Sequence, residues 1–271
     1  PRGLQVYLRR VRAKRIFKEI GNTRIRSIIS EDKSNFEWPG KYTAAVMITH
    51  DVETAKGQKN IRKLIKIERD KRITSCWNFV TDRYDVDTTL ISELKTSGHE
   101  IGVHGVYHDG KLFSSRAVFQ KRLPAIRDAA EKWGATGFRS PSLLYKTNLL
   151  RELPFSWDSS IPAWDPFQPQ PGGCRCYYPF KLSDACVELP VTLWQDFTLF
   201  EELCESGIDI WKAQIDDIYK IGGLINVIVH PDYMNEQRLS MYDELLEHLQ
   251  SKQQLWFALP SGISRWILEK N

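Results

Sequence analysis

The sequence has no apolar run near the ~20 residues that a membrane-spanning helix requires, and its first residues lack the apolar core of a signal peptide. It also has no low-complexity tract, which argues against a disordered or fibrous protein. No nucleic-acid recognition motif accompanies its basic residues, so we expect no nucleic-acid partner. We therefore expect a cytoplasmic protein. Because the chain begins at Pro1, a leader removed before that residue stays open as an alternative.

Cysteine is scarce, with five residues that follow no framework spacing. An odd number of cysteines without a pattern fits free thiols in a reducing compartment. The segment Cys174-Arg175-Cys176 could be a fragment of a metal site, but a C-x-C without a second pair is weak evidence for one. A structural or incidental role is the simpler interpretation.

Of the 271 residues, 42% are hydrophobic and 27% are charged, which is typical of a globular protein able to bury a large core. The net charge of +4 is unevenly distributed, because residues 1–27 hold nine Lys or Arg against one acid. The remainder has 29 basic against 33 acidic residues. We predict a basic N-terminal helical extension over residues 1–37 and one catalytic domain over residues 38–271.

The basic extension has apolar residues at near-helical spacing between Leu4 and Ile20, with arginines and lysines among them. Two interpretations stay open. The extension could lie on an anionic surface, as a peripheral contact of residues 1–27 with the inner membrane or with an acidic polymer. Alternatively, it is a solvated helix whose apolar stripe packs on the domain.

After Trp38-Pro39-Gly40, apolar strand-like runs alternate with amphipathic helical runs, which predicts an α/β protein with a parallel sheet. Seven strands are expected, at Ala44–Thr49, Ser75–Val80, Ile101–His104, Thr136–Arg139, Phe155–Asp158, Cys186–Pro190 and Leu224–His230. Helices are expected at Asn60–Asp70, Thr88–Ser97, Ser115–Trp133, Ile208–Ile221 and Leu239–Ser251. This order indicates a distorted, seven-stranded (β/α) barrel in one domain.

A long connection, Ala163–Asp184, is rich in proline, glycine and aromatic residues. Loops of this length are usually disordered or functional, and the aromatic residues argue against disorder. We expect it to fold over the top of the barrel. Its aromatic residues, Trp164, Tyr177, Tyr178 and Phe180, could stack on a sugar ring or form a small core within the loop.

Ligand-type residues gather where three of these strands end. His104 and His108 are four residues apart, a spacing at which two imidazoles can bind one metal ion. Asp51 and Glu53 follow another strand and are two residues apart, so they point to the same side and one can ligate while the other takes a proton. His230 ends a third strand and could protonate a leaving group. Strand ends of a barrel are where active sites lie.

Two histidines and one carboxylate are the ligand set of a catalytic zinc, and Glu53 is our choice for the third ligand. Cobalt, manganese or iron would accept the same ligands. His50 is the spare candidate for the third ligand. His99 stands at a strand entrance, where a structural role is expected, and His248 lies in a charged helical pattern that faces solvent.

Taken in order, these segments resemble the NodB-homology polysaccharide deacetylases of carbohydrate esterase family 4. The resemblance spans roughly residues 42–232. Thr49-His50-Asp51-Val52-Glu53 occupies the place of that family's T-F-D-D-G motif, and His104-Gly105-Val106-Tyr107-His108 that of its H-(S/T)-x-x-H motif. The resemblance implies that Asp51 is the general base and that His104 and His108 ligate the metal.

Three further segments carry the same resemblance. Phe138-Arg139-Ser140-Pro141-Ser142 looks like the family's R-x-P motif, which implies that Arg139 orients the base and that the Ser142 N–H stabilises an oxyanion. Ile228-Val229-His230 resembles the last motif and makes His230 the acid. Trp157-Asp158-Ser159-Ser160 and Trp164-Asp165 resemble the region that polarises the acid and lines the acetyl pocket. The implied substrate-binding residues are Pro141, Trp164, Asp165 and Tyr178, with Asp158 as the residue that polarises His230.

The sequence departs from the family pattern at three positions. Val52 separates two acids that are adjacent in the family, Gly105 replaces a serine or threonine, and Leu143 stands where glycine often occurs. These departures predict a divergent branch. In the wider superfamily, deformylases of lipid-linked sugars and amidases of cyclic ureides share the chemistry but not the substrate.

The expected function is that of a metal-dependent hydrolase that removes an N-acetyl group from an amino sugar of a bacterial surface polysaccharide or its precursor. One alternative is a deformylase or deacetylase of a lipid-linked sugar at the inner membrane. The other is a non-catalytic carbohydrate-binding homologue. The partners implied are an acetylated amino sugar or polysaccharide precursor and one divalent metal ion, most simply zinc.

Overall fold

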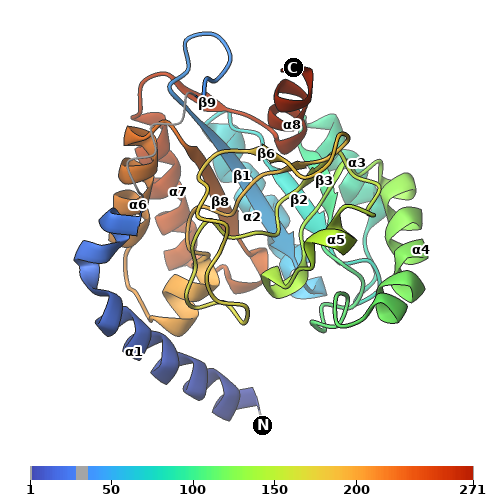
Figure 1. Cartoon of the computed structure of the whole chain (residues 1–271), viewed down its shortest axis with the longest axis horizontal. Helices are drawn as coiled ribbons and strands as arrows, with labels where there is room; N and C mark the ends of the chain where they lie inside the picture. The colour runs from blue at the N-terminus through green and yellow to red at the C-terminus, as the bar shows by residue number, and fades with distance from the viewer. Residues whose placement is uncertain (1, 29–35, 271) are drawn as a thin grey trace.

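The structure is a computed structural model that describes residues 2–28 and 36–270, with side chains of the first helix described for residues 7–20. Within these ranges the chain forms one sheet with helices packed around it (Figure 1). Its strands are β1 (Ala44–Val52), β2 (Cys76–Phe79), β3 (Glu100–Val103), β4 (Gly137–Phe138), β5 (Trp157–Asp158), β6 (Phe180–Lys181), β7 (Val187–Glu188), β8 (Leu224–Val229) and β9 (Leu255–Phe257).

The strands follow the order β6-β7-β5-β4-β3-β2-β1-β8, and β9 pairs with the start of β1. All pairs are parallel except β6 with β7. The sheet therefore curls through most of a barrel, with the carboxyl ends of its parallel strands at one edge. This arrangement confirms the predicted distorted (β/α) barrel. Each of the seven predicted strands is present, and the described sheet has two that were not predicted, β6 and β9.

Most helices connect the strands and cover the outer face of the sheet, whereas α1 (Arg2–Ile28) and α8 (Pro260–Glu269) lie at its two ends (Figure 1). The other helices are α2 (Ala55–Asp70), α3 (Thr88–Thr96), α4 (Arg116–Trp133), α5 (Thr147–Leu150), α6 (Asp209–Lys220) and α7 (Glu236–Gln250), with short turns η1 (Pro141–Leu143), η2 (Phe197–Glu202) and η3 (Pro231–Tyr233). The five predicted helices correspond to α2, α3, α4, α6 and α7. None of the described helices is both long and apolar enough to cross a membrane.

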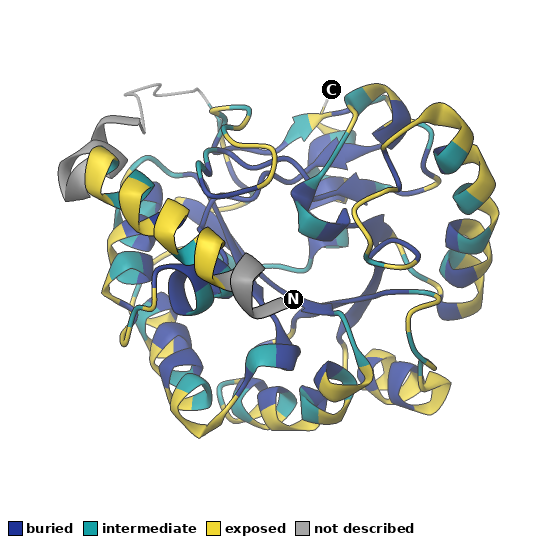
Figure 2. Cartoon of the chain, turned by 90° about the horizontal axis from the view of Figure 1, so that it is seen from below, coloured by how far each residue is buried: buried dark blue, intermediate teal, exposed yellow. Residues whose placement is uncertain are grey.

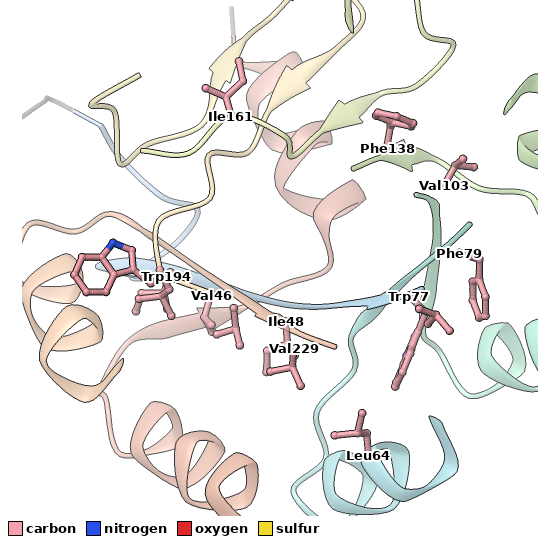
Figure 3. Close-up of a cluster of buried hydrophobic side chains, with 14 of the residues drawn as sticks. Val46, Ile48, Leu64, Trp77, Phe79, Val103, Phe138, Ile161, Trp194 and Val229 are labelled. Atoms are coloured by element: carbon pink, nitrogen blue, oxygen red, sulfur yellow. The ribbon is translucent and has the colours of Figure 1, made fainter. Parts of the chain in front are cut away.

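Side chains alternate along β1 between two buried layers, because successive residues of a strand point to opposite faces. Val46 and Ile48 point toward the surrounding helices, where Leu64 of α2 faces them (Figure 3). Ala45 and Met47 belong to a separate cluster inside the barrel. The whole strand is buried, as expected of a parallel sheet covered on both faces.

The inner cluster fills the barrel below the site. It joins residues of β1, β5 and β7 to Ile263 and Ile267 of α8. Helix α8 thus covers the end of the barrel away from the carboxyl ends of its strands, and the other end stays accessible. Burial of these apolar side chains is the dominant stabilising term of such a core.

The barrel is closed between β8 and the segment after β7 by side chains rather than by a strand ladder. Asn226 of β8 donates from Nδ2 to the carbonyls of Leu189 and Pro190 at 3.3 and 3.0 Å, and its backbone N–H donates to Thr192 Oγ1 at 2.9 Å. We call this contact the seam. It lies on the side of the barrel where the predicted long connection, residues 163–184, enters the sheet as β6.

Candidate active site

The carboxyl ends of β1, β3, β4 and β8 surround a cavity of about 200 Å³. Figure 2 looks onto this edge of the sheet. The cavity is lined by residues that follow different strands and by residues of the first helix and of η2, namely Arg9, Arg12, Asp51, Glu53, His104, His108, Ser140, Ser142, Leu143, Phe167, Gln168, Pro169, Gln195, Phe197, Thr198, Glu202, His230 and Tyr233. Ligand-type side chains predicted from three separate segments therefore meet at one cavity.

Three side chains at this cavity could hold a metal ion. Ligand atoms of Glu53, His104 and His108 all lie within 4.8 Å of one another. Nε2 of His104 and of His108 are buried and have no hydrogen-bond partner within residues 2–28 and 36–270. His108 Nε2 is 2.8 Å from Glu53 Oε1, but without hydrogen-bonding geometry. Buried imidazole nitrogens without partners beside a carboxylate are what a zinc-type donor set looks like without its ion, so the residues fit a divalent cation.

The His104 ring is oriented by the backbone of the neighbouring strand. Its Nδ1 lies 3.0 Å from the carbonyl oxygen of Arg139, so Nδ1 carries the proton and Nε2 is left as the free ligand atom. Burial lowers the pKa of His104 to about 4, and the nearby Asp51 only partly offsets this effect. The imidazole is therefore neutral at physiological pH, the form that binds metals.

His108 reaches the same point through a turn with two left-handed residues. Gly105 has φ +67° and His108 has φ +52°. A Cβ atom on Gly105 would lie 2.7 Å from Cγ of Pro141, closer than carbon atoms approach in folded proteins. Gly105 therefore has a steric reason to replace the serine or threonine of the family motif: both the left-handed conformation and Pro141 exclude a side chain there.

Glu53 is held by its own backbone and by a carboxylate on another loop. Its N–H donates to Asp232 Oδ2 at 3.0 Å, and the hydroxyl of Thr54 donates to the other oxygen of Asp232. Burial would raise the pKa of Glu53, but His108 and His230 outweigh it, so the pKa is lowered and the group is ionised. An ionised carboxylate beside two neutral imidazoles completes the ligand set.

Asp51 lies beside the ligand group and faces three basic side chains. Its Oδ1 accepts from Asn78 Nδ2 at 2.8 Å and is 3.9 Å from Arg139 Nε. Its Oδ2 is 3.9 Å from Nε2 of His104 and equally far from Nε2 of His230. Burial opposes ionisation of Asp51, but these neighbours prevail and lower its pKa. Asp51 is therefore an ionised carboxylate at neutral pH.

Arg139 is completely buried next to Asp51. Its Nη2 donates to Ser159 Oγ at 2.9 Å, whereas Nε and Nη1 have no hydrogen-bond partner among the described residues. A buried guanidinium is stable only beside negative charge, and Asp51 is the carboxylate within ion-pair distance of it. Arg139 thus fixes the position and charge of Asp51.

His230 follows β8 and is paired with Asp196. His230 Nδ1 lies 2.5 Å from Asp196 Oδ1, and the His230 backbone N–H donates to Asp196 Oδ2 at 2.7 Å. Burial would lower the pKa of His230, but Asp196, with smaller contributions from Glu53 and Asp51, raises it to about 10. The ring is therefore protonated at neutral pH with Nε2 directed toward Asp51 and Glu53.

We expected Asp158 to polarise His230, and the structure places it elsewhere. The oxygens of Asp158 accept from the backbone N–H and the hydroxyl of Ser160, both at 3.0 Å, and the carboxyl lies beside that of Glu188. Burial raises the pKa of both acids, that of Asp158 to about 6. The expectation for Asp158, on β5, was therefore wrong. The acid that contacts His230 is Asp196, on the loop before η2.

The expected substrate-binding residues also occupy different places. Tyr178 donates to the carbonyl of Ile221, which follows α6 and precedes β8 at the opposite end of the barrel, and it does not line the cavity. Trp164 packs on Trp194, and Asp165 is buried, where it accepts from Phe167 N and Gln168 Nε2. Only Phe167, Gln168 and Pro169 of the long connection reach the cavity.

Two residues of the R-x-P-like segment differ in their position. Ser142 lines the cavity with φ +55°, and Leu143 follows with φ +48°. Pro141 lies behind this turn, against Gly105, and lines a smaller neighbouring cavity rather than the main one. Pro141 therefore shapes the His104–His108 turn instead of contacting a ligand.

His50, the spare candidate for the third ligand, points away from the site. Its Nε2 lies 2.6 Å from Glu68 Oε1, and its ring stacks on Trp77 with centroids 4.0 Å apart. Strand alternation explains the difference, because Asp51 faces the barrel interior and His50 faces α2. His99 shares this buried network through Ser75, and His248 pairs with Asp216 near the surface.

Several functional positions carried no motif. Asp196 follows an apolar run, and its acidic side chain after a buried segment was the available signal. Asn78 is a single amide on a buried strand, on the same face as Asp51 through the register of β1 with β2. Asp232 comes two residues after His230, a spacing that gives no separate signal.

Comparison with known proteins finds solved structures with a similar fold. No protein-family profile matches the sequence, and no curated protein matches it. Similar solved structures include a candidate polysaccharide deacetylase from Mycobacterium smegmatis (TM-score 0.66, 21% identity, covering 86% of this chain and 92% of that protein). They also include the allantoinase PuuE (TM-score 0.70, 17% identity, covering 90% of this chain and 97% of that protein). A third is a candidate polysaccharide deacetylase from Pseudomonas aeruginosa PAO1 (TM-score 0.68, 17% identity, covering 86% of this chain and 94% of that protein).

At these identities the likeness establishes the fold. The chain has the NodB-type (β/α) barrel fold of the polysaccharide deacetylases, the fold that the sequence motifs predicted. Reaction and substrate rest on the geometry of the cavity.

Proposed function

We propose that the protein is a metal-dependent hydrolase that removes an N-acyl group, most simply N-acetyl, from an amino sugar of a bacterial surface polysaccharide or its precursor. The observation that carries this proposal is the meeting of the Glu53, His104 and His108 ligand atoms, within 4.8 Å of one another, with an ionised Asp51 and a protonated His230 beside them. A proton acceptor and a proton donor thus flank a site for a cation.

In the proposed reaction Asp51 takes the proton of the attacking water. Its carboxylate is ionised, and Arg139 and Asn78 hold it in position, so little rearrangement is needed before the proton is transferred. A divalent cation held by Glu53, His104 and His108 would polarise the amide carbonyl and acidify the water. Zinc fits two imidazoles and one carboxylate, and cobalt, manganese or iron would be accepted by the same ligands.

His230 acts as the acid that protonates the departing amine. Its ring is protonated because Asp196 holds Nδ1, and Nε2 is free to give a proton to the departing amine. Ser142 lines the cavity in a turn with φ +55°, from which its backbone N–H would stabilise the oxyanion. Phe167 and Gln168 would bound the acyl pocket in place of the expected tryptophan and tyrosine.

The test measures metal content and acyl release together. We expect near-stoichiometric metal in the purified or zinc-reconstituted protein and release of acetate from N-acetylated amino sugars, with formate release measured in parallel. His104→Ala and Glu53→Ala should lose both. Asp51→Asn should keep the metal and lose release, because it removes the base without removing a ligand.

The outcomes separate this proposal from its rivals. Metal retained in Glu53→Ala would mean that a group other than Glu53 is the third ligand. Sugar binding without release of acetate or formate, unaffected by Asp51→Asn, would leave a non-catalytic carbohydrate-binding homologue. Absence of metal after reconstitution would contradict the hydrolase mechanism.

One observation favours a second candidate substrate, a lipid-linked amino sugar at the inner membrane. Tyr7, Leu8 and Val11 of α1 are exposed, at 63%, 56% and 51%, among basic residues of the same helix. Exposed apolar side chains beside positive charge are typical of a surface that lies on anionic lipid. Sedimentation with anionic vesicles tests this idea. Replacement of the three residues by serine should abolish vesicle binding. Absence of vesicle binding by the wild type would contradict the lipid-linked substrate.

A further inference from the structure

Helix α1 is fixed to the barrel along one face. Ala13 is 2% exposed, and Ile16, Phe17 and Ile20 pack against the main core. The Phe17 ring meets the edge of Trp194 with centroids 6.3 Å apart. These contacts dock the helix beside η2, in front of the carboxyl ends of the strands (Figure 2).

A second face of the same helix turns toward the site. Arg9 and Arg12 are three residues apart, a spacing that places them side by side on a helix. Both line the cavity that also contains Asp51, the ligand group and His230. Arg10, by contrast, points elsewhere and bonds the carbonyl of Glu201. The basic extension predicted from the sequence therefore contributes to the wall of the cavity.

The two guanidinium groups have no close carboxylate of their own. Among the described side chains, no acid lies within ion-pair distance of Arg9 or Arg12. Glu202 also lines the cavity, and burial raises its pKa to about 7 while the two arginines partly oppose the rise. Glu202 is therefore only partly ionised near neutral pH, and the positive charge at this wall is not neutralised.

Charge thus differs between the two parts of the cavity. The side chains of Asp51 and Glu53 lie at its floor, where the amide would be hydrolysed, and two arginines stand at its wall on α1. An uncharged amide can bind at the floor. A carboxylate or phosphate group would bind at the wall, because paired guanidinium groups bind the oxygens of both.

We propose that Arg9 and Arg12 form an anion subsite, and that the natural substrate is an amino sugar bearing a carboxylate or a phosphate close to its N-acyl group. This proposal rests on the proposed function and narrows its substrate class. Because both groups line one cavity of about 200 Å³, the anionic group belongs to the same sugar as the amide or to the unit directly linked to it.

The rival explanation is that the arginines only hold α1 in place near Glu202. The docking face makes this unnecessary, since Ala13, Phe17 and the Arg10 contact with Glu201 already attach the helix. Glu202 would instead compete with a bound anion for the two guanidinium groups. The two explanations therefore predict opposite effects of Glu202→Gln.

The experiment measures binding of three sugars to the zinc-loaded full chain by calorimetry. They are N-acetylglucosamine, which is neutral, N-acetylmuramic acid, which carries a carboxylate, and N-acetylglucosamine 1-phosphate. We expect at least one acidic sugar to bind about tenfold or more tightly than the neutral one, and the preferred acid identifies the anion. The Arg9→Gln/Arg12→Gln double variant should lose this preference and bind the neutral sugar as before.

Two variants serve as controls. Arg15→Gln removes a charge from the same helix at an exposed residue that pairs with Glu19, and it should change nothing. Glu202→Gln removes the competing carboxylate and should strengthen binding of the acidic sugar a few-fold at pH 8. Weaker binding in Glu202→Gln would support the rival explanation and overturn the subsite.

Other results would also overturn the proposal. Equal binding of neutral and acidic sugars by the wild type would do so, as would an equal loss for all three sugars in the double variant. In His104→Ala the preference for the acidic sugar should persist, and its disappearance would mean that the anion binds the metal instead. Absence of acyl release from every sugar with the preference intact would refute the hydrolase and leave the subsite standing.

Discussion

Replacement of Asp196 by Asn should lower the pKa of His230, the proposed acid, and narrow the pH range of activity. Asp196 contacts His230 twice, through Nδ1 at 2.5 Å and through the backbone N–H at 2.7 Å, and it is the largest cause that raises the pKa of His230 from 6.5 to about 10. This rise corresponds to a preference for the protonated ring on the order of 5 kcal/mol.

An asparagine keeps the size of the side chain and an acceptor oxygen but removes the charge. Burial, which opposes protonation, would then prevail, and only Glu53 and Asp51 would still favour the charged ring. Because the acid must be protonated to act, activity falls as the pH rises through its pKa. We expect the alkaline limb of the kcat/KM profile to move down by about two units or more. A divalent cation bound at the site would lower the pKa of His230 in the wild type and in Asp196→Asn alike, so the difference between the two pKa values would remain.

The assay is the pH profile of kcat/KM for acyl release, measured for the wild type, Asp196→Asn and Asp158→Asn. Asp158 was the acid first expected to polarise His230, and its contacts with Ser160 and Glu188 make it a matched control whose alkaline limb should not move. An unchanged limb in Asp196→Asn would refute the assignment of His230 as the acid held by Asp196. A shift in Asp158→Asn alone would restore the first expectation.

Three further outcomes are expected. Gly105→Ser, which restores the family's residue, should destabilise the protein by about 2 kcal/mol in urea unfolding, because φ is +67° and Pro141 leaves no room; unchanged stability would contradict this. Glu68→Gln should lower the free energy of unfolding by about 3 kcal/mol, because it breaks a buried pair with His50. Burial opposes ionisation of Glu68, but His50, Tyr242 and Ser75 lower its pKa below 4.5, so this stabilisation is present above pH 4.5 and disappears as the pH falls through the folded pKa; a difference that persists in acid would count against it. Added zinc should raise Tm of the wild type and not of Glu53→Ala, since an ion that binds only the folded state stabilises it; equal shifts would remove Glu53 from the ligand set.

The predicted strands and most of the predicted site came from local patterns with a physical basis. The two-residue separation of Asp51 and Glu53 placed both on the site side of β1, and the same alternation, applied to His50, would have excluded it as a ligand. Strand ends gave the position of His104 and His230 because a barrel gathers such ends at one edge.

The site contacts that the sequence did not predict depend on the paths of the loops. Asp196 reaches His230 from an irregular segment 34 residues earlier, and no local pattern specifies that return. Tyr178 was expected at the site because its loop is aromatic, yet the connection passes the opposite end of the barrel before β6 begins. The division into an extension, residues 1–37, and a domain, residues 38–271, stays a prediction, although Arg9 and Arg12 at the cavity wall make the extension part of the proposed site.

The seam between β8 and the segment after β7 links the shape of the barrel to its chemistry. Asn226 ties the two sides together low in the barrel, and the contact of Asp196 with His230 ties the same two sides at the rim. Both ties are side-chain hydrogen bonds, which can break without unravelling a strand ladder. A movement that widens the barrel here would separate His230 from Asp196 and lower the pKa of His230. The protonation of the proposed acid would therefore depend on the closed seam.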